Sequence, residues 1–304
     1  MSRETESMFK ALHKYLDENS DENRTEDDVR RLVNDFMEHY NGHIPAPVTE
    51  DTAETSDDYL ELAYNAETIK EAKKYAKKAL KLDPHNYDAE IAVIDLSTWD
   101  DTRTVRDYAK AVQKATKHMD EEGYFEDDCI GAFWGILETR PYMRLRGRYV
   151  QALLQCGMIG QARDECEELL RLCEGDNMGM RYNLMHIYSY FEDEDAAISL
   201  HKRFDSYDET EMLLPLSILY YKRGNYAKAK QYLSRLNNAN KDLGKFLKIV
   251  LGYEDEDFEG FELEGGYRPG TIEEFMMELR NNHFIFINMD AYMEWALDQM
   301  SKFK

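Results

Sequence analysis

Apolar residues recur at intervals of three and four along most of the chain, and alternating apolar and polar runs are almost absent. A spacing of three and four places apolar side chains along one face of an α-helix, whereas alternation would indicate a β-strand. We therefore predict an all-α protein built from amphipathic helices.

The first 42 residues are expected to form a helical appendage with two helices of its own. Thr25 and Asp28 have the spacing of a helix N-terminal cap and precede the second helix. The segment 43–57 is acidic and contains two prolines, so it predicts a linker. The expected apolar faces are formed by Met8, Leu12, Tyr15 and Leu16, and by Val29, Leu32, Val33, Phe36 and Tyr40.

Small residues recur with a long period in the body of the chain. Ala162, Ala196 and Ala229 are 34 and 33 residues apart, which matches the period of about 34 residues seen in arrays of helix pairs. We predict a right-handed α-α superhelix of antiparallel helix pairs over residues 58–252, with an insertion near 120–138. In two of these pairs, Gly157 and Gly224 are expected at the turn between the helices.

Residues 253–304 are expected to contain an acidic loop and a helical cap that covers the last repeat. Asp255, Asp257 and Glu259 alternate as at the start of a calcium-binding loop, but the twelfth position is Gly266, where a bidentate glutamate is required. A solvated loop is the favoured interpretation. The sequence predicts no metal site and no cofactor.

The repeats resemble the tetratricopeptide family over roughly residues 58–240, in segments such as "IKEAKKYAKKALKLDPHN" and "LYYKRGNYAKAKQYLSRL". A narrower resemblance is carried by "ETRPYMRLR", "GDNMGMRY" and the spacing between them. These segments are similar to a group of uncharacterised bacterial tetratricopeptide proteins related to the suppressor-of-tumorigenicity-seven family. The resemblance implies a helical repeat fold and no established biochemical activity.

Composition narrows the classes of partner. The chain has 38 Lys plus Arg against 61 Asp plus Glu, and its formal net charge is -23. Such an acidic surface repels phosphate backbones and anionic lipids, so nucleic-acid and membrane binding are disfavoured. The N-terminal residues lack the apolar run of a secretory signal, and no apolar stretch is long enough to span a bilayer. A cytoplasmic location is therefore expected.

Positive charge nevertheless gathers at Arg140, Arg144, Arg146 and Arg148. The repeat pattern assigns each residue a position in its helix pair. By this assignment, side chains from the first helix of three successive pairs point toward the concave surface of the superhelix. An arginine fork binds a carboxylate bidentately, so such a groove would suit an acidic or C-terminal peptide. The predicted groove residues are Arg144, Gln151, Gln155, Arg181, Tyr188, Tyr221 and Lys222.

Two alternatives stay open for these features. The arginines could instead pair with local acids such as Glu138, Glu165 and Asp176 and hold neighbouring repeats together. Phe133 and Trp134 could form an apolar docking patch, although such a run is more often packed against the helix that follows it.

No catalytic signature stands out in the sequence. The favoured function is therefore a non-enzymatic module for protein-protein interaction, which binds an acidic protein or peptide partner in the groove. A structural scaffold or homodimer is the first alternative. An enzyme of unknown reaction, with a site between the insertion and the C-terminal cap, is the second.

Overall fold

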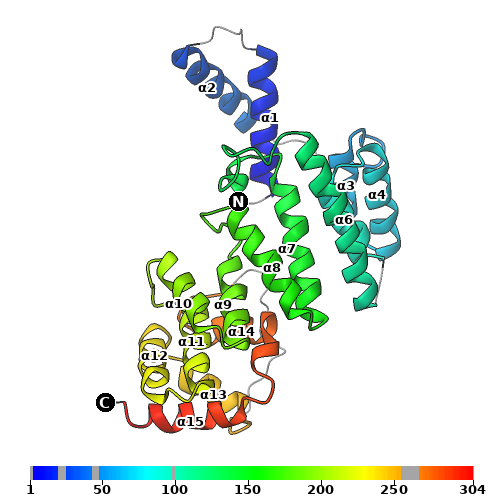
Figure 1. Ribbon diagram of the computed structural model, residues 1–304. Coiled ribbons are helices and arrows are strands. Elements are labelled where there is room, and N and C mark those ends of the chain that lie inside the picture. Colours follow the sequence, from blue (N-terminus) through cyan, green and yellow to red (C-terminus); the bar gives the residue numbers. More distant parts are fainter. Residues whose placement is uncertain (1–2, 20–24, 43–47, 98–99, 255–266, 304) are drawn as a thin grey trace. The chain divides into compact units, whose positions relative to one another are not determined.

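The computed structural model describes residues 3–19, 25–42, 48–97, 100–254 and 267–303. Within these ranges the chain is all-α, as predicted, with α-helices and short 3-10 helices joined by turns (Figure 1). Its only extended pairing in the described ranges is an isolated antiparallel bridge between Ala132 and Cys173.

The chain divides into two compact units, and the division falls within the expected repeat array. Unit 1 contains Met1–Ser97 and Phe133–Arg144, and unit 2 contains Thr98–Ala132 and Leu145–Lys304. The helices of unit 1 are α1 (Arg3–Asn19), α2 (Glu26–Gly42), α3 (Ser56–Tyr64), α4 (Ile69–Leu82), α5 (Tyr87–Asp95) and η1 (Phe133–Gly135). Helix α7 (Arg140–Gln155) begins in unit 1 and continues in unit 2.

The remaining helices belong to unit 2 and follow one another in chain order. A long helix comes first, then the helices of the expected repeats, and then those of the expected cap. They are α6 (Asp101–Glu121), α8 (Ile159–Leu172), α9 (Met180–Tyr190), α10 (Glu194–Arg203), α11 (Thr210–Lys222), α12 (Tyr226–Ala239), α13 (Leu243–Val250), α14 (Ile272–Asn281), η4 (His283–Ile285) and α15 (Asp290–Met300).

The two N-terminal helices pack through the apolar positions read from the sequence. The Thr25 hydroxyl donates to the Asp28 carboxylate, and the Asp28 backbone N–H donates back to that hydroxyl, so the expected cap begins α2. The Phe36 ring is buried and lies 5.6 Å from the Tyr15 ring and 5.4 Å from the Tyr40 ring, between centroids.

Small residues let α3, α4 and α5 approach closely in unit 1. Ala76, Ala79 and Ala89 are fully buried, and Tyr59 and Leu60 pack in the same cluster. Helix α4 turns Ala76 and Ala79 inward, so most of its lysines are left on the outer face.

One repeat position differs from the prediction. Ala162 and Ala229 are fully buried, but Ala196 is only half-buried and the fully buried residue is its neighbour Ala197. Ala162, Ala197 and Ala229 are each the fourth residue of the second helix in a pair. The buried alanine therefore keeps the same position within the second helix of each pair, while the loops between helices vary in length.

Left-handed residues mark the turns inside the pairs. Gly157 (φ 68°) and Gly224 (φ 72°) stand between the paired helices, as expected. The pair α9 and α10 uses Glu192 (φ 59°) at the equivalent place. A side chain at positive φ is strained because Cβ crowds the following carbonyl oxygen, and glycine avoids this strain at the other two turns.

Replacing Glu192 with glycine should relieve this strain. We expect the free energy of unfolding to rise by about 1 kcal/mol, reduced by loss of the Glu192 ion pair with Lys222. Urea denaturation measures the change. Glu192→Ala is the matched control, because it removes the carboxylate but keeps a Cβ atom and therefore the strain at positive φ. If the glycine variant is no more stable than the alanine variant, the strain argument fails.

The C-terminal helices pack against one another and against α11 and α12 in unit 2. Phe246 of α13 stacks on Phe275 of α14 with ring centroids 4.6 Å apart, and both rings are fully buried. Residues 255–266, which include the predicted acidic loop and the calcium-like sequence, lie outside the described residues.

None of the helices in the described ranges combines the length and the apolar character needed to cross a bilayer.

Candidate functional site

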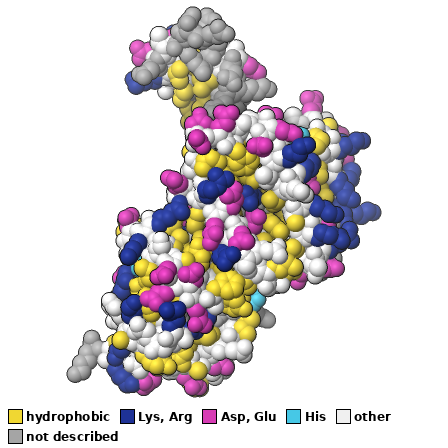
Figure 2. Space-filling view, in the orientation of Figure 1, with side chains coloured by type: hydrophobic (Ala, Val, Ile, Leu, Met, Phe, Trp, Pro, Cys, Tyr) yellow, Lys and Arg dark blue, Asp and Glu magenta, His cyan; other side chains and the backbone are white. Residues whose placement is uncertain are grey.

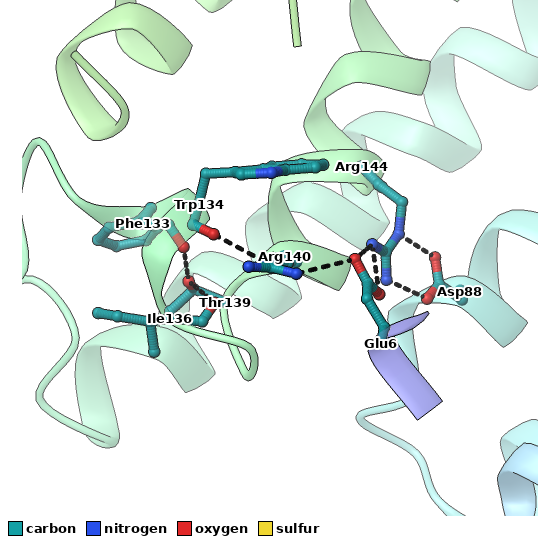
Figure 3. Close-up of polar contacts among 8 residues, drawn as sticks. All are labelled: Glu6, Asp88, Phe133, Trp134, Ile136, Thr139, Arg140 and Arg144. Carbon is teal, nitrogen blue, oxygen red and sulfur yellow. Dashed lines mark hydrogen bonds and ion pairs between the residues drawn. The ribbon is translucent and has the colours of Figure 1, made fainter. Parts of the chain in front are cut away.

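The clearest polar constellation in unit 1 surrounds the carboxylate of Glu6. Arg140 and Arg144 are four residues apart at the start of α7, so they lie on one face of the helix. Asp88 comes from the first turn of α5, and Glu6 comes from α1. We call the group formed by Glu6, Asp88, Trp134, Arg140 and Arg144 the Glu6 site (Figure 3).

Hydrogen bonds just before α7 place Arg140. The Thr139 hydroxyl lies against the carbonyl oxygens of Phe133 and Ile136, so it closes the turn that leads into the helix. Arg140 Nε donates to the Trp134 carbonyl oxygen at 2.7 Å, and its guanidinium lies 5.6 Å from the Trp134 ring centroid.

Arg144 bridges two carboxylates from distant parts of the sequence. Its Nε and Nη2 donate to the two oxygens of Asp88 at 2.8 and 2.6 Å. Its Nη1 donates to both oxygens of Glu6 at 2.9 Å. Asp88 therefore fixes the plane of the guanidinium and aims the remaining nitrogen at Glu6.

The Glu6 site is largely shielded from water and balanced in charge. The side chains of Glu6 and Arg140 keep 9% and 8% of their exposure, and that of Arg144 keeps 20%. Burial lowers the pKa of Arg144, but the hydrogen bonds and charges of Asp88 and Glu6 outweigh it and leave the pKa above its ordinary value. Arg140 Nη1 lies 3.5 Å from Glu6, so two cations face two anions.

Ion pairing also occupies other members of the arginine cluster. Arg146 pairs in unit 2 with Glu165 at 2.8 Å and with Glu168 at 3.3 Å, so Glu165 is one of the expected partners. Arg148 is exposed. The arginines thus form ion pairs with acids of the same chain, as the alternative interpretation expected. Glu6, however, was not among the acids that the sequence suggested as partners.

The predicted groove residues of α7 and α9 are distributed over different environments. Gln151 is half-buried and Gln155 is exposed. Arg181 pairs with Asp176 at 3.0 Å and with Glu209 at 3.3 Å, and it lies over the Tyr182 ring. The Tyr188 hydroxyl donates to Glu167 at 2.9 Å.

The predicted groove residues of α11 contact other helices of unit 2. The Tyr221 ring packs against Tyr292 and Trp295 of α15, with centroids 5.3 and 5.2 Å away. The Lys222 ammonium donates to the carbonyl oxygens of Ser189 and Tyr190 at the end of α9. Both residues therefore hold neighbouring helices together.

The two residues of the suggested docking patch lie in different environments. The Phe133 side chain is fully buried, and its ring centroid lies 6.2 Å from that of Tyr142. Trp134 is half-buried and contacts Arg140. Phe133 is thus a core residue, whereas Trp134 forms part of the Glu6 site.

A second polar cluster, which we call the buried glutamate cluster, lies between α9, α11 and α14 in unit 2. Glu274 accepts hydrogen bonds from Thr210 at 2.6 Å and from Asn240 at 2.9 Å. The Tyr267 hydroxyl donates to Glu211 at 2.6 Å. The third member, Glu278, pairs with His186, and all three glutamates are buried.

The pKa values of two groups are perturbed in this cluster. Burial raises the pKa of Glu211 to about 7, and the charges of Glu274 and Glu278 add to the increase while Tyr267 opposes it. Burial lowers the pKa of His186, but Glu278, 2.7 Å from Nε2, leaves it above its ordinary value.

The sequence held only a partial signal for the buried glutamate cluster. Glu274 and Glu278 are four apart, so they share one face of α14. Nothing in their neighbourhood indicates that this face meets Glu211 and His186, which lie far away in the chain. The amphipathic pattern predicts that charged residues of a helix face solvent. For these glutamates the prediction is wrong, because they are buried.

Unit 2 also contains a cavity of about 570 Å³ near the insertion. Two arginines, two glutamates and two apolar residues line it, so its charges balance. The lining residues are Ile130, Glu167, Leu170, Arg171, Glu174 and Arg203. Arg203 donates to the Leu170 carbonyl oxygen and Arg171 pairs with Glu168, so both guanidiniums have partners.

Among the described side chains, no group of three or more His, Cys, Asp or Glu residues is arranged to hold a metal ion. No protein-family model matches the chain, and no curated protein matches it.

Proposed function

We propose that this chain is a non-enzymatic protein-interaction module that recognises an acidic side chain on a helix of its partner. The observation that carries the proposal is the capture of Glu6 by Arg140 and Arg144. The proposal also takes the helix pairs as a tetratricopeptide-like, right-handed array in a cytoplasmic bacterial protein. The recurrent buried alanines support the close packing of repeated helix pairs.

The geometry of Arg144 favours recognition over a purely structural pairing. Asp88 already supplies a bidentate partner for the guanidinium, so the Glu6 carboxylate is a second ligand held by the remaining nitrogen. That second ligand comes from a helix 138 residues away in the chain. A carboxylate on another protein's helix would find the same donors, and α1 acts as a competitor within the chain.

Competition by a peptide tests the proposal on the full-length protein. The probe is a labelled peptide that copies residues 3–19. We expect Glu6→Gln in the protein to raise the affinity for this peptide by roughly tenfold, because the competing carboxylate within the chain is removed. Fluorescence anisotropy measures the dissociation constant.

Two controls accompany this measurement. Glu38→Gln removes an exposed carboxylate of α2 and should leave the affinity unchanged. A probe in which Glu6 is replaced with Gln should bind the Glu6→Gln protein at least tenfold more weakly than the native probe. Equal binding of the two probes would contradict recognition of the carboxylate.

A further inference from the structure

Helix α4 carries a line of lysines on its outer face. Lys70, Lys73, Lys77 and Lys81 are spaced by three, four and four residues, so they align along the helix. We call these four residues the lysine face. The opposite side of α4 is held in the core of unit 1 by buried alanines, which keeps the lysine face turned outward.

The lysine face lacks ion partners, although acids greatly outnumber bases in the chain. None of its four ammonium groups has an ion-pair partner among the described residues. The other two lysines of α4 are engaged, since Lys74 pairs with Glu50 at 2.6 Å and Lys78 lies over the Tyr59 ring. Like charges this close repel one another, so the face is a strongly unsatisfied positive surface.

The surroundings of the lysine face favour a narrow ligand. Lys and Arg side chains gather over the part of unit 1 occupied by α4 in Figure 2. Exposed acids of unit 1 also lie on α4 and in the segment just before α3. Glu50 of that segment pairs with Lys74 of α4. These acids are Glu50, Asp51, Glu54 and Glu71. A planar anionic membrane would meet these acids together with the lysines, whereas a single extended chain could follow the lysines alone.

The chemistry of the face argues against nucleic acid. Binding of single strands uses aromatic rings on which bases stack, but the only ring of α4, Tyr75, hydrogen-bonds Glu50 and stacks on Tyr59. A long phosphate backbone would extend beyond the lysine face onto the rest of the surface, where the net charge of -23 repels it, whereas a short segment would not.

We propose that the lysine face binds an acidic, Asp- and Glu-rich segment of a partner protein. The line from Lys70 to Lys81 is about 16 Å long at 1.5 Å per residue, which an extended peptide of about five residues would span. Lysine ammonium groups are flexible point charges, so they suit a series of carboxylates without demanding one fixed geometry. This surface is separate from the Glu6 site, and the two proposals can fail independently.

The test uses full-length protein and a labelled twelve-residue peptide of alternating Asp and Glu. Charge reversal of the lysine face (Lys70→Glu, Lys73→Glu, Lys77→Glu, Lys81→Glu) should weaken binding at about 0.15 M salt by at least tenfold. The control reverses four exposed lysines outside the lysine face and so has the same net charge; these are Lys110, Lys202, Lys241 and Lys245. The control should change the affinity by no more than about twofold, since long-range charge alone is screened.

A milder variant guards against misfolding. Replacing the four lysines of the face with Gln should keep the helical circular dichroism and thermal transition, and should still weaken binding about tenfold. Equal losses in the face and control variants would overturn the proposal. So would face-dependent binding of phosphatidylserine vesicles or duplex DNA that is tighter than binding of the acidic peptide.

Discussion

Arg144→Ala should lower the free energy of unfolding by about 3–5 kcal/mol, because the substitution leaves buried carboxylates without their bridging cation. Asp88 would lose both of its guanidinium hydrogen bonds, and Glu6 would keep only Arg140 at 3.5 Å. Urea denaturation at neutral pH measures the change. Arg148→Ala, an exposed position four residues further along α7, should cost no more than about 1 kcal/mol.

Removing Arg144 together with both of its carboxylate partners should rescue much of this loss. In the triple variant Glu6→Gln, Asp88→Asn and Arg144→Met, no unpaired charge is left at these three positions, and Arg140 keeps its hydrogen bond to the Trp134 carbonyl oxygen. We therefore expect most of the lost stability to return. This outcome would show that the loss in Arg144→Ala arises from unpaired carboxylates. If the triple variant is as unstable as the single one, packing of the Arg144 stem explains the effect instead.

The second large effect is a pH dependence caused by Glu211. Its pKa is raised from 4.5 to about 7 in the folded chain, so between these values the folded state retains a proton that the unfolded state has released. The folded state therefore binds more protons, and stability must fall as pH rises through this window. The contribution of Glu211 is about 3 kcal/mol across the window.

Glu211→Gln should abolish this part of the pH dependence. The amide cannot ionise, but it keeps an oxygen that can accept from Tyr267. Denaturation curves at pH 5 and pH 8 should show that the variant loses less stability than the native chain, by roughly 2–3 kcal/mol. A native chain with the same pH dependence as the variant would contradict the assignment.

Glu273 provides a control with the opposite sign on helix α14. Its hydrogen bonds to Arg268 hold the pKa of Glu273 below its ordinary value of 4.5. Any stability it contributes is present above pH 4.5 and is lost only as pH falls below that value. Glu273→Gln should therefore leave the change between pH 5 and pH 8 as it is in the native chain.

Much of the helical framework could be predicted because it depends on local spacing. The cap at Thr25 and Asp28 and the buried Phe36 follow from hydrophobic periodicity and backbone hydrogen bonding within a few residues. Gly157 and Gly224 follow from the need for positive φ at tight turns. The turn at Glu192 does not follow in this way, because a strained residue replaces the glycine that marks the equivalent turns in the other two pairs.

The candidate sites were less predictable because they depend on residues that are far apart in the chain. The clustering of arginines near residue 144 was visible in the sequence. The acids that would meet the arginines were not, since 61 Asp and Glu residues offered too many possible partners. Glu6 is 138 residues from Arg144, and Asp88 is 56 residues from it.

The sequence by itself therefore determined the all-α class, the faces that α1 and α2 bury, and the positions of the glycine turns. These features arise from side-chain spacing and backbone sterics within one or two turns of helix. Only the tertiary structure decided that Arg144 joins Glu6 to Asp88 and that Glu211 is buried beside other carboxylates. Those outcomes depend on which helices pack together, and the energy of a charge depends on the partners and the burial that this packing provides.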